Sequence, residues 1–141
     1  MLSKLLVPRL MIPAFIAALA LTLFMALDPL PPSTPLDRYG DKTEHMLAFF
    51  TLAILSSIGF PRVRARHLFE HLSFLGALIE VFQASPMIHR DCDWTDWVAD
   101  SIAVALALAA MRWAGPMMAR REAARNAARA PSDLNGSDRA L

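Results

Sequence analysis

The sequence predicts an all-α fold, an integral membrane bundle of four transmembrane helices. The 141-residue chain is 55% hydrophobic and only 19% charged, with a mean hydropathy of +0.37, whereas an ordinary soluble domain is about 45–50% apolar and about 25% charged. Its apolar residues gather in four runs, and a run of about 20 residues is needed to span a hydrocarbon core. Its Lys and Arg residues are sorted unevenly among the segments between these runs.

The same composition excludes several classes of protein. An intrinsically disordered chain and a basic nucleic-acid-binding domain both carry more charge, so no nucleic acid partner is expected. Cys92 is the single cysteine, which excludes an intramolecular disulfide and a CxxC metal site. We expect no cofactor.

The first two predicted helices have clear boundaries. Residues 10–27 contain no charge and are followed by Asp28 and Pro29. The apolar region of a signal peptide is typically ~7–15 residues long, so a cleaved signal peptide is the less favoured alternative. The second helix has a polar start at residues 41–45, an apolar run over residues 46–60, and a stop at Gly59 and Pro61.

The third and fourth predicted helices carry ionisable residues within their apolar runs. The third, residues 68–84, has the weakest signal, because only residues 72–79 are free of charge. The fourth covers residues 94–113, with Asp96 and Asp100 in its first two turns. Residues 1–114 are therefore predicted to form the membrane domain, and residues 115–141 a basic, partly disordered cytoplasmic tail with a helix over residues 119–130.

The distribution of basic residues predicts the orientation. With four passes and a cytoplasmic N-terminus, eleven Lys and Arg residues lie inside and three lie outside. Because Lys and Arg in short loops resist translocation, both termini are expected in the cytoplasm of a bacterial plasma (inner) membrane.

Polar residues of three predicted helices converge on the outer end. They are Asp41, Lys42 and His45 in the second helix, Glu80 and Gln83 in the third, Arg90 in the next loop, and Asp96 and Asp100 in the fourth. Spacings of three or four residues within each helix put these groups on one face. An ionisable side chain in lipid costs at least ~2.5–3.5 kcal/mol, so these faces are expected to line a polar pocket that opens outward.

These motifs resemble the signature of the VanZ-like family of small bacterial membrane proteins. The resemblance rests on Asp41-Lys42-x-x-His45, on Glu80-x-x-Gln83, and on Arg90 followed by Asp96-x-x-x-Asp100. It covers residues 41–111 and implies a cell-envelope role connected with susceptibility to glycopeptide antibiotics such as teicoplanin.

Four interpretations of the pocket stay open. It could bind a lipid headgroup, a peptide or a glycopeptide unchanged, or it could be an active site in which Lys42 and Arg90 hold a phosphate while His45 and Glu80 act as acid and base. It could hold a metal ion on His45, Glu80, Asp96 and Asp100, although Lys42 and Arg90 can neutralise these carboxylates without one. It could be a structural network that fixes the helix register.

We favour binding of an envelope lipid, a cell-wall intermediate or a glycopeptide-type ligand at the outer leaflet. The ligand-binding candidates are Asp41, Lys42, Gln83, Arg90, Asp96 and Asp100, and the catalytic candidates are His45 and Glu80. No metal is expected in this interpretation. An oligomer is compatible with the sequence.

Overall fold

The computed structural model describes residues 3–28, 32–33, 40–85 and 93–129. This part of the chain contains four α-helices and no strand: α1 (Ser3–Leu27), α2 (Asp41–Gly59), α3 (Ala65–Gln83) and α4 (Trp94–Arg129). The all-α prediction is confirmed. The chain divides into two compact units, residues 1–111 and residues 112–141.

A glycine stands at each end of α2. Gly40 precedes the helix with φ of 87°, a conformation that residues with a Cβ rarely adopt, and its carbonyl accepts the N–H of Thr43 at 3.1 Å. The helix ends at Gly59, and the N–H of Phe60 closes the last turn on the carbonyl of Ser56 at 2.8 Å. Both ends of α2 agree with the sequence prediction.

The predicted end of the fourth helix at residue 113 is wrong, because α4 continues to Arg129 and includes the tail segment that was expected to form its own helix. Pro116 lies inside α4. A proline there removes one backbone hydrogen bond. The surrounding Ala, Met and Arg residues are strong helix formers, so the helix continues through the proline.

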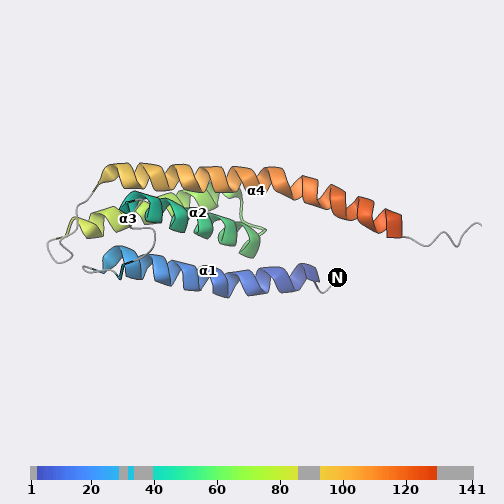
Figure 1. Ribbon diagram of the computed structural model, residues 1–141, viewed down its shortest axis with the longest axis horizontal. Helices are drawn as coiled ribbons and strands as arrows, with labels where there is room; N and C mark the ends of the chain where they lie inside the picture. The colour runs from blue at the N-terminus through green and yellow to red at the C-terminus, as the bar shows by residue number, and fades with distance from the viewer. Residues whose placement is uncertain (1–2, 29–31, 34–39, 86–92, 130–141) are drawn as a thin grey trace, which may run out of the picture. The chain divides into compact units, whose positions relative to one another are not determined.

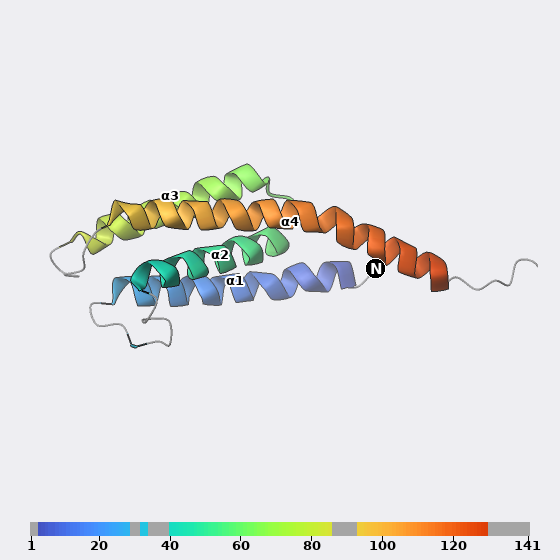
Figure 2. The same cartoon turned by 45° about the horizontal axis from the view of Figure 1, so that its top comes forward.

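The helices of the first unit lie side by side (Figures 1 and 2). α1 packs along α2, and α3 lies beside the first half of α4. Ser73 and Ser101 join α3 to α4 through a hydroxyl–hydroxyl hydrogen bond of 2.8 Å, and the indole N–H of Trp97 donates to the carbonyl of Ser73 at 3.0 Å. Small polar residues of this kind are common where helices pack in membranes.

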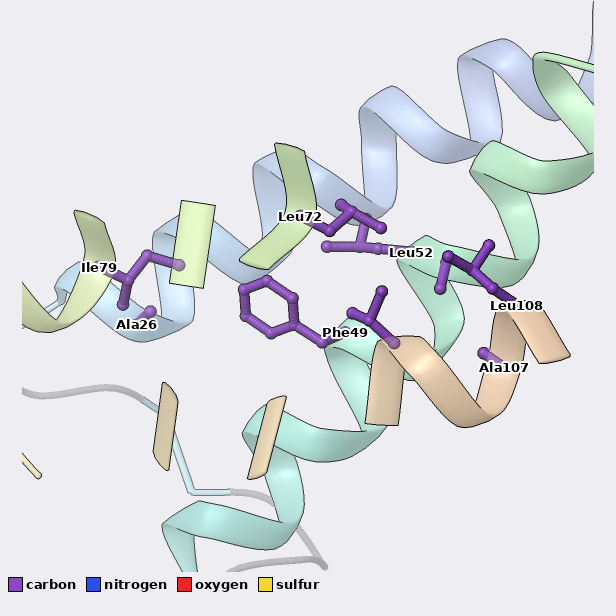
Figure 3. Packing of buried hydrophobic residues seen from close by; sticks show 9 residues of the cluster. Ala26, Phe49, Leu52, Leu72, Ile79, Ala107 and Leu108 are labelled. Carbon is purple, nitrogen blue, oxygen red and sulfur yellow. The ribbon is translucent and has the colours of Figure 1, made fainter. Parts of the chain in front are cut away.

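The core is a narrow stripe of side chains. On α2, Phe49, Leu52 and Ala53 share one face, and all three are completely buried. Figure 3 shows Phe49 between Ile79 of α3 on one side and Leu108 of α4 on the other. On each of these helices the same stripe continues into buried ionisable or amide residues: His45 on α2, Glu80 and Gln83 on α3, and Asp96 and Asp100 on α4. The core is therefore apolar along most of its length and polar at one end.

Much of the outer surface of the helices is apolar. α1 exposes Leu10, Ile16, Leu21 and Phe24, and α3 exposes Phe74, Leu78, Val81 and Phe82. Two helices of the described chain, α1 over Arg9–Leu27 and α4 over Trp94–Ala128, are long and apolar enough to cross a membrane, and only 6% and 22% of their spanning windows are buried. A core helix of a soluble protein would be mostly buried. The other two helices, 19 residues each, do not meet this criterion.

Candidate ligand-binding site

The first turns of α2 and α4 and the last turn of α3 meet at the polar end of the core. Because consecutive helices run in opposite directions, residues from positions 42–45, 80–83 and 93–100 come together. We call Lys42, His45, Glu80, Asp93, Asp96 and Asp100 the polar cluster. The sequence predicted this convergence from the three- and four-residue spacings.

Lys42 joins α2 to α4. Its ammonium lies 2.9 Å from Asp96 Oδ1 and 3.5 Å from Asp93 Oδ2, and it also donates to the hydroxyl of Thr95. The Lys42 side chain is 44% exposed, whereas that of Asp96 is 12% exposed. The ammonium is therefore committed to groups of its own chain, which gives it a smaller part in holding a ligand phosphate than the sequence suggested.

His45 and Asp100 form the deepest pair of the cluster. His45 Nδ1 lies 3.5 Å from Asp100 Oδ2, and the two side chains are 7% and 1% exposed. Gly76 of α3 provides the space beside them: a Cβ built there would stand 3.7 Å from Asp100 Oδ2 and 3.4 Å from the ring of Trp97. A histidine held by a buried carboxylate has a fixed ring orientation, which suits both ligand binding and proton transfer.

Glu80 and Gln83 accept from or donate to backbone groups of other segments. Glu80 Oε2 accepts the backbone N–H of Asp93 at 3.1 Å, just before α4 begins. The Gln83 amide donates to the carbonyl of Ala26 at 2.9 Å. That carbonyl belongs to the last turn of α1, where backbone acceptors have no partner within the helix. Gln83 therefore joins α3 to α1.

Two residues of the site escaped the sequence interpretation. Asp93 stands immediately before α4, where its Oδ1 accepts the N–H of Thr95 at 2.9 Å and its carbonyl accepts the N–H of Asp96 at 2.8 Å. This is helix N-capping. An Asp two residues before Thr95 and three before Asp96 is a capping signal that could have identified Asp93. The contact of Thr95 with Lys42 spans 53 residues and has no local signal.

The hydrogen bonds on Asp93 shift its titration. The Thr95 hydroxyl, then the Thr95 N–H and the charge of Lys42, hold the pKa of the Asp93 carboxyl below its usual value. The carboxylate is therefore ionised at neutral pH and available to the Lys42 ammonium.

Two of the candidate site residues fall at or beyond the edge of the described chain. Arg90 lies outside the described residues, and Asp41 is described only as the first residue of α2. Among the side chains that are described, no three His, Cys, Asp or Glu residues are grouped as metal ligands. The metal interpretation therefore has no geometry to support it in that part of the chain.

A groove of about 360 Å³ opens beside the cluster, between α1 and α2. Ala18, Leu21 and Met25 form its α1 wall, and Leu47, Ala48 and Thr51 form its α2 wall. Glu44 and His45 lie at one end of it. His45 thus belongs both to the groove and to the polar cluster.

No protein-family model, no curated protein and no solved structure matches this chain. Its functional assignment therefore rests on the geometry of its own residues.

Proposed function

We propose that this chain is a VanZ-like multi-pass protein of the bacterial plasma membrane that binds an envelope lipid or lipid-linked cell-wall intermediate. One observation carries the proposal: His45, Glu80, Asp96 and Asp100 are all buried at one end of a mainly apolar core. Burying an ionisable group away from water carries a desolvation cost, and ionisable groups inside a membrane bundle usually mark a functional site. Hydrogen bonds between membrane helices contribute only about 0.6 kcal/mol on average. A purely structural network therefore gives little reason to bury four ionisable groups.

The four-pass arrangement is part of the proposal. In addition to the two helices that meet the criterion for spanning, α3 exposes Phe74, Val81 and Phe82 to 65%, 67% and 55%, a contiguous apolar face that suits lipid better than water. α1 takes part in the packing through Ala26, which is buried and accepts the bond from Gln83. These contacts favour a retained first helix over a cleaved signal peptide.

The orientation supports a ligand at the outer leaflet. With four passes, the cytoplasmic side carries eleven basic residues. The polar cluster then lies at the opposite ends of the helices, level with lipid headgroups. The basic residues assigned to the cytoplasm are Lys4, Arg9, Arg62, Arg64, Arg66, Arg112, Arg120, Arg121, Arg125, Arg129 and Arg139.

Lipid titration of the purified full-length chain tests the proposal. We expect saturable binding of an envelope phospholipid, detected by native mass spectrometry. Asp96→Asn is expected to bind about tenfold more weakly, because it removes the charged partner of Lys42 in the polar cluster and a charge-assisted contact is worth ~1.5–3 kcal/mol. Glu70→Gln is the matched control, because Glu70 pairs with Arg66 at the start of α3, away from the cluster. Absence of saturable binding, or equal binding by both variants, would contradict the proposal. Tight binding of a glycopeptide with no lipid binding would show that the ligand is a glycopeptide and not a lipid.

Catalysis on the same ligand is a second candidate, and the His45–Asp100 pair favours it. A carboxylate beside Nδ1 orients the imidazole and stabilises its protonated form, as a general base requires. This candidate predicts that His45→Gln keeps lipid binding while a chemical change of the bound lipid, followed by mass, stops.

A further inference from the structure

The groove between α1 and α2 has apolar walls although two threonines line it. Thr22 donates its hydroxyl to the carbonyl of Ala18 at 2.9 Å, and Thr51 donates its hydroxyl to the carbonyl of Leu47 at 2.8 Å. Each hydroxyl is thus bonded to its own helix four residues back. The groove is left with methyl and methylene groups, and this surface suits a hydrocarbon chain.

The polar residues of the groove are confined to one end. α1 and α2 run in opposite directions, so Met25 and Ala26 near the end of α1 lie level with Glu44 and His45 near the start of α2. Ala18 and Thr51 lie at the other end. From Ala18 to Met25 the helix rises roughly 10 Å. A molecule in the groove therefore meets Glu44 and His45 at one end and mainly hydrocarbon over the remaining length.

The rims of the groove face outward. Leu21 on one side and Leu47 on the other are 61% and 50% exposed, whereas the floor residues Thr22 and Ala26 are buried. The groove volume of about 360 Å³ lies near the lower end of the ~300–1,000 Å³ typical of small-molecule sites. It is suited to one slender chain that enters sideways from the bilayer.

We propose that this groove holds one acyl chain of a membrane phospholipid whose amine-bearing headgroup lies at Glu44. The inference rests on the proposed function and names its ligand class. The Glu44 carboxylate accepts a charge-assisted hydrogen bond from an ammonium group, and a headgroup without an amine lacks this charged donor. Phosphatidylethanolamine is therefore preferred to phosphatidylglycerol with the same acyl chains.

Competition between these two lipids tests the groove. The full-length protein in detergent is titrated with each lipid, and one bound lipid per chain is followed by native mass spectrometry. We expect the Kd for phosphatidylethanolamine to be about tenfold lower, equivalent to one charge-assisted contact. Glu44→Gln is expected to make the two Kd values equal. Ala48→Trp fills the groove and is expected to weaken binding of both lipids at least tenfold.

Two further variants keep the test decisive. Ala110→Trp places the same side chain on an exposed position of α4 outside the groove, and it is expected to bind like wild type. Ala18→Trp fills the groove from the α1 side, and it replaces Ala48→Trp if the latter does not fold.

The possible outcomes distinguish failure of the groove proposal from failure of the proposed function. Unchanged phosphatidylethanolamine binding by both groove-filling variants, together with weakened binding by Asp96→Asn, would overturn the groove and leave the proposed function standing. Equal binding of the two lipids by wild type would overturn the headgroup assignment. Failure of wild type to bind any lipid saturably would overturn both proposals.

Discussion

At the scale of single residues, Asp93 connects three helices. Its N–H donates to Glu80 at the end of α3, its carboxylate caps α4 through Thr95, and the same carboxylate lies near Lys42 of α2. Replacing Asp93 by Ala removes the cap and leaves Lys42 with one acidic partner fewer, which is expected to lower the Tm by a few degrees. Asp93→Asn can still cap the helix, and its Tm is expected to fall by less than that of Asp93→Ala.

The lowered pKa of Asp93 predicts a pH dependence. A carboxyl whose folded-state pKa lies below its unfolded value of ~3.9 contributes stability above that pH, and the contribution is lost as the pH falls through the folded-state value. As the pH is lowered from about 5 to about 2, the Tm of wild type is therefore expected to fall further than the Tm of Asp93→Asn. The difference in Tm between the two proteins in detergent isolates Asp93 from the other carboxylates. A constant difference across this range would show that Asp93 does not titrate as described.

Gly76 gives a second prediction at this scale. A Cβ at position 76 would make ordinary van der Waals contacts with Trp97, Phe49 and Asp100 at 3.4–3.7 Å, so Gly76→Ala is expected to be tolerated and to gain up to ~1 kcal/mol of helix propensity. Gly76→Leu has no such space and is expected to cost about 1–3 kcal/mol through overpacking. Thermal unfolding of the two variants checks the packing, and a stable Gly76→Leu protein would contradict it.

At the scale of helices, α3 decides whether the chain has four passes. Its exposed apolar face predicts that Phe74→Lys puts a charge into lipid, at a cost of about 2.5–3.5 kcal/mol to insertion. Val63→Lys, at an exposed position before α3, is the matched control and is expected to insert normally. The measurement is the amount of each variant in the membrane fraction. In a soluble protein an exposed lysine at position 74 would be harmless, so equal amounts would contradict a membrane-spanning α3.

The helices themselves were largely predictable from the sequence, because their ends are marked locally. Asp28 and Pro29 mark the end of α1, and Gly59 and Pro61 mark the end of α2. The continuation of α4 through Pro116 was not predicted, because a proline after a glycine usually ends a helix and the helix-forming residues beyond it outweighed that signal. The convergence of His45, Glu80, Asp96 and Asp100 was predictable from their spacing and from alternating helix directions.

The partners within the cluster were not predictable. Lys42 could have paired with Glu80, Asp96 or Asp100, and the choice of Asp96 depends on how α2 and α4 are rotated and shifted relative to each other. Packing of residues far apart in sequence fixes that register. The groove at Glu44 likewise arises only when α1 lies against α2, and no local pattern records it.

At the scale of the whole first unit, the core changes character along its length. Apolar residues from Phe49 to Leu108 fill most of it, and the polar cluster occupies the end where α2 and α4 begin. In a four-pass protein this places charged groups near one leaflet and the basic loop around residues 62–66 near the other. Function and topology are thus linked, because a lipid headgroup can reach the cluster only if that end faces the leaflet that holds the lipid.

The most direct test of this account is the sidedness of the two ends of α2. In a Cys92→Ser background, Thr43→Cys and Val63→Cys each introduce one thiol at an exposed position. A membrane-impermeant thiol reagent is applied to intact cells that express the protein, with any outer barrier opened, and again after lysis. We predict that position 43 reacts in intact cells and that position 63 reacts only after lysis. Reaction of both positions, or of position 63 alone, in intact cells would contradict a membrane-spanning α2 with the polar cluster facing outward.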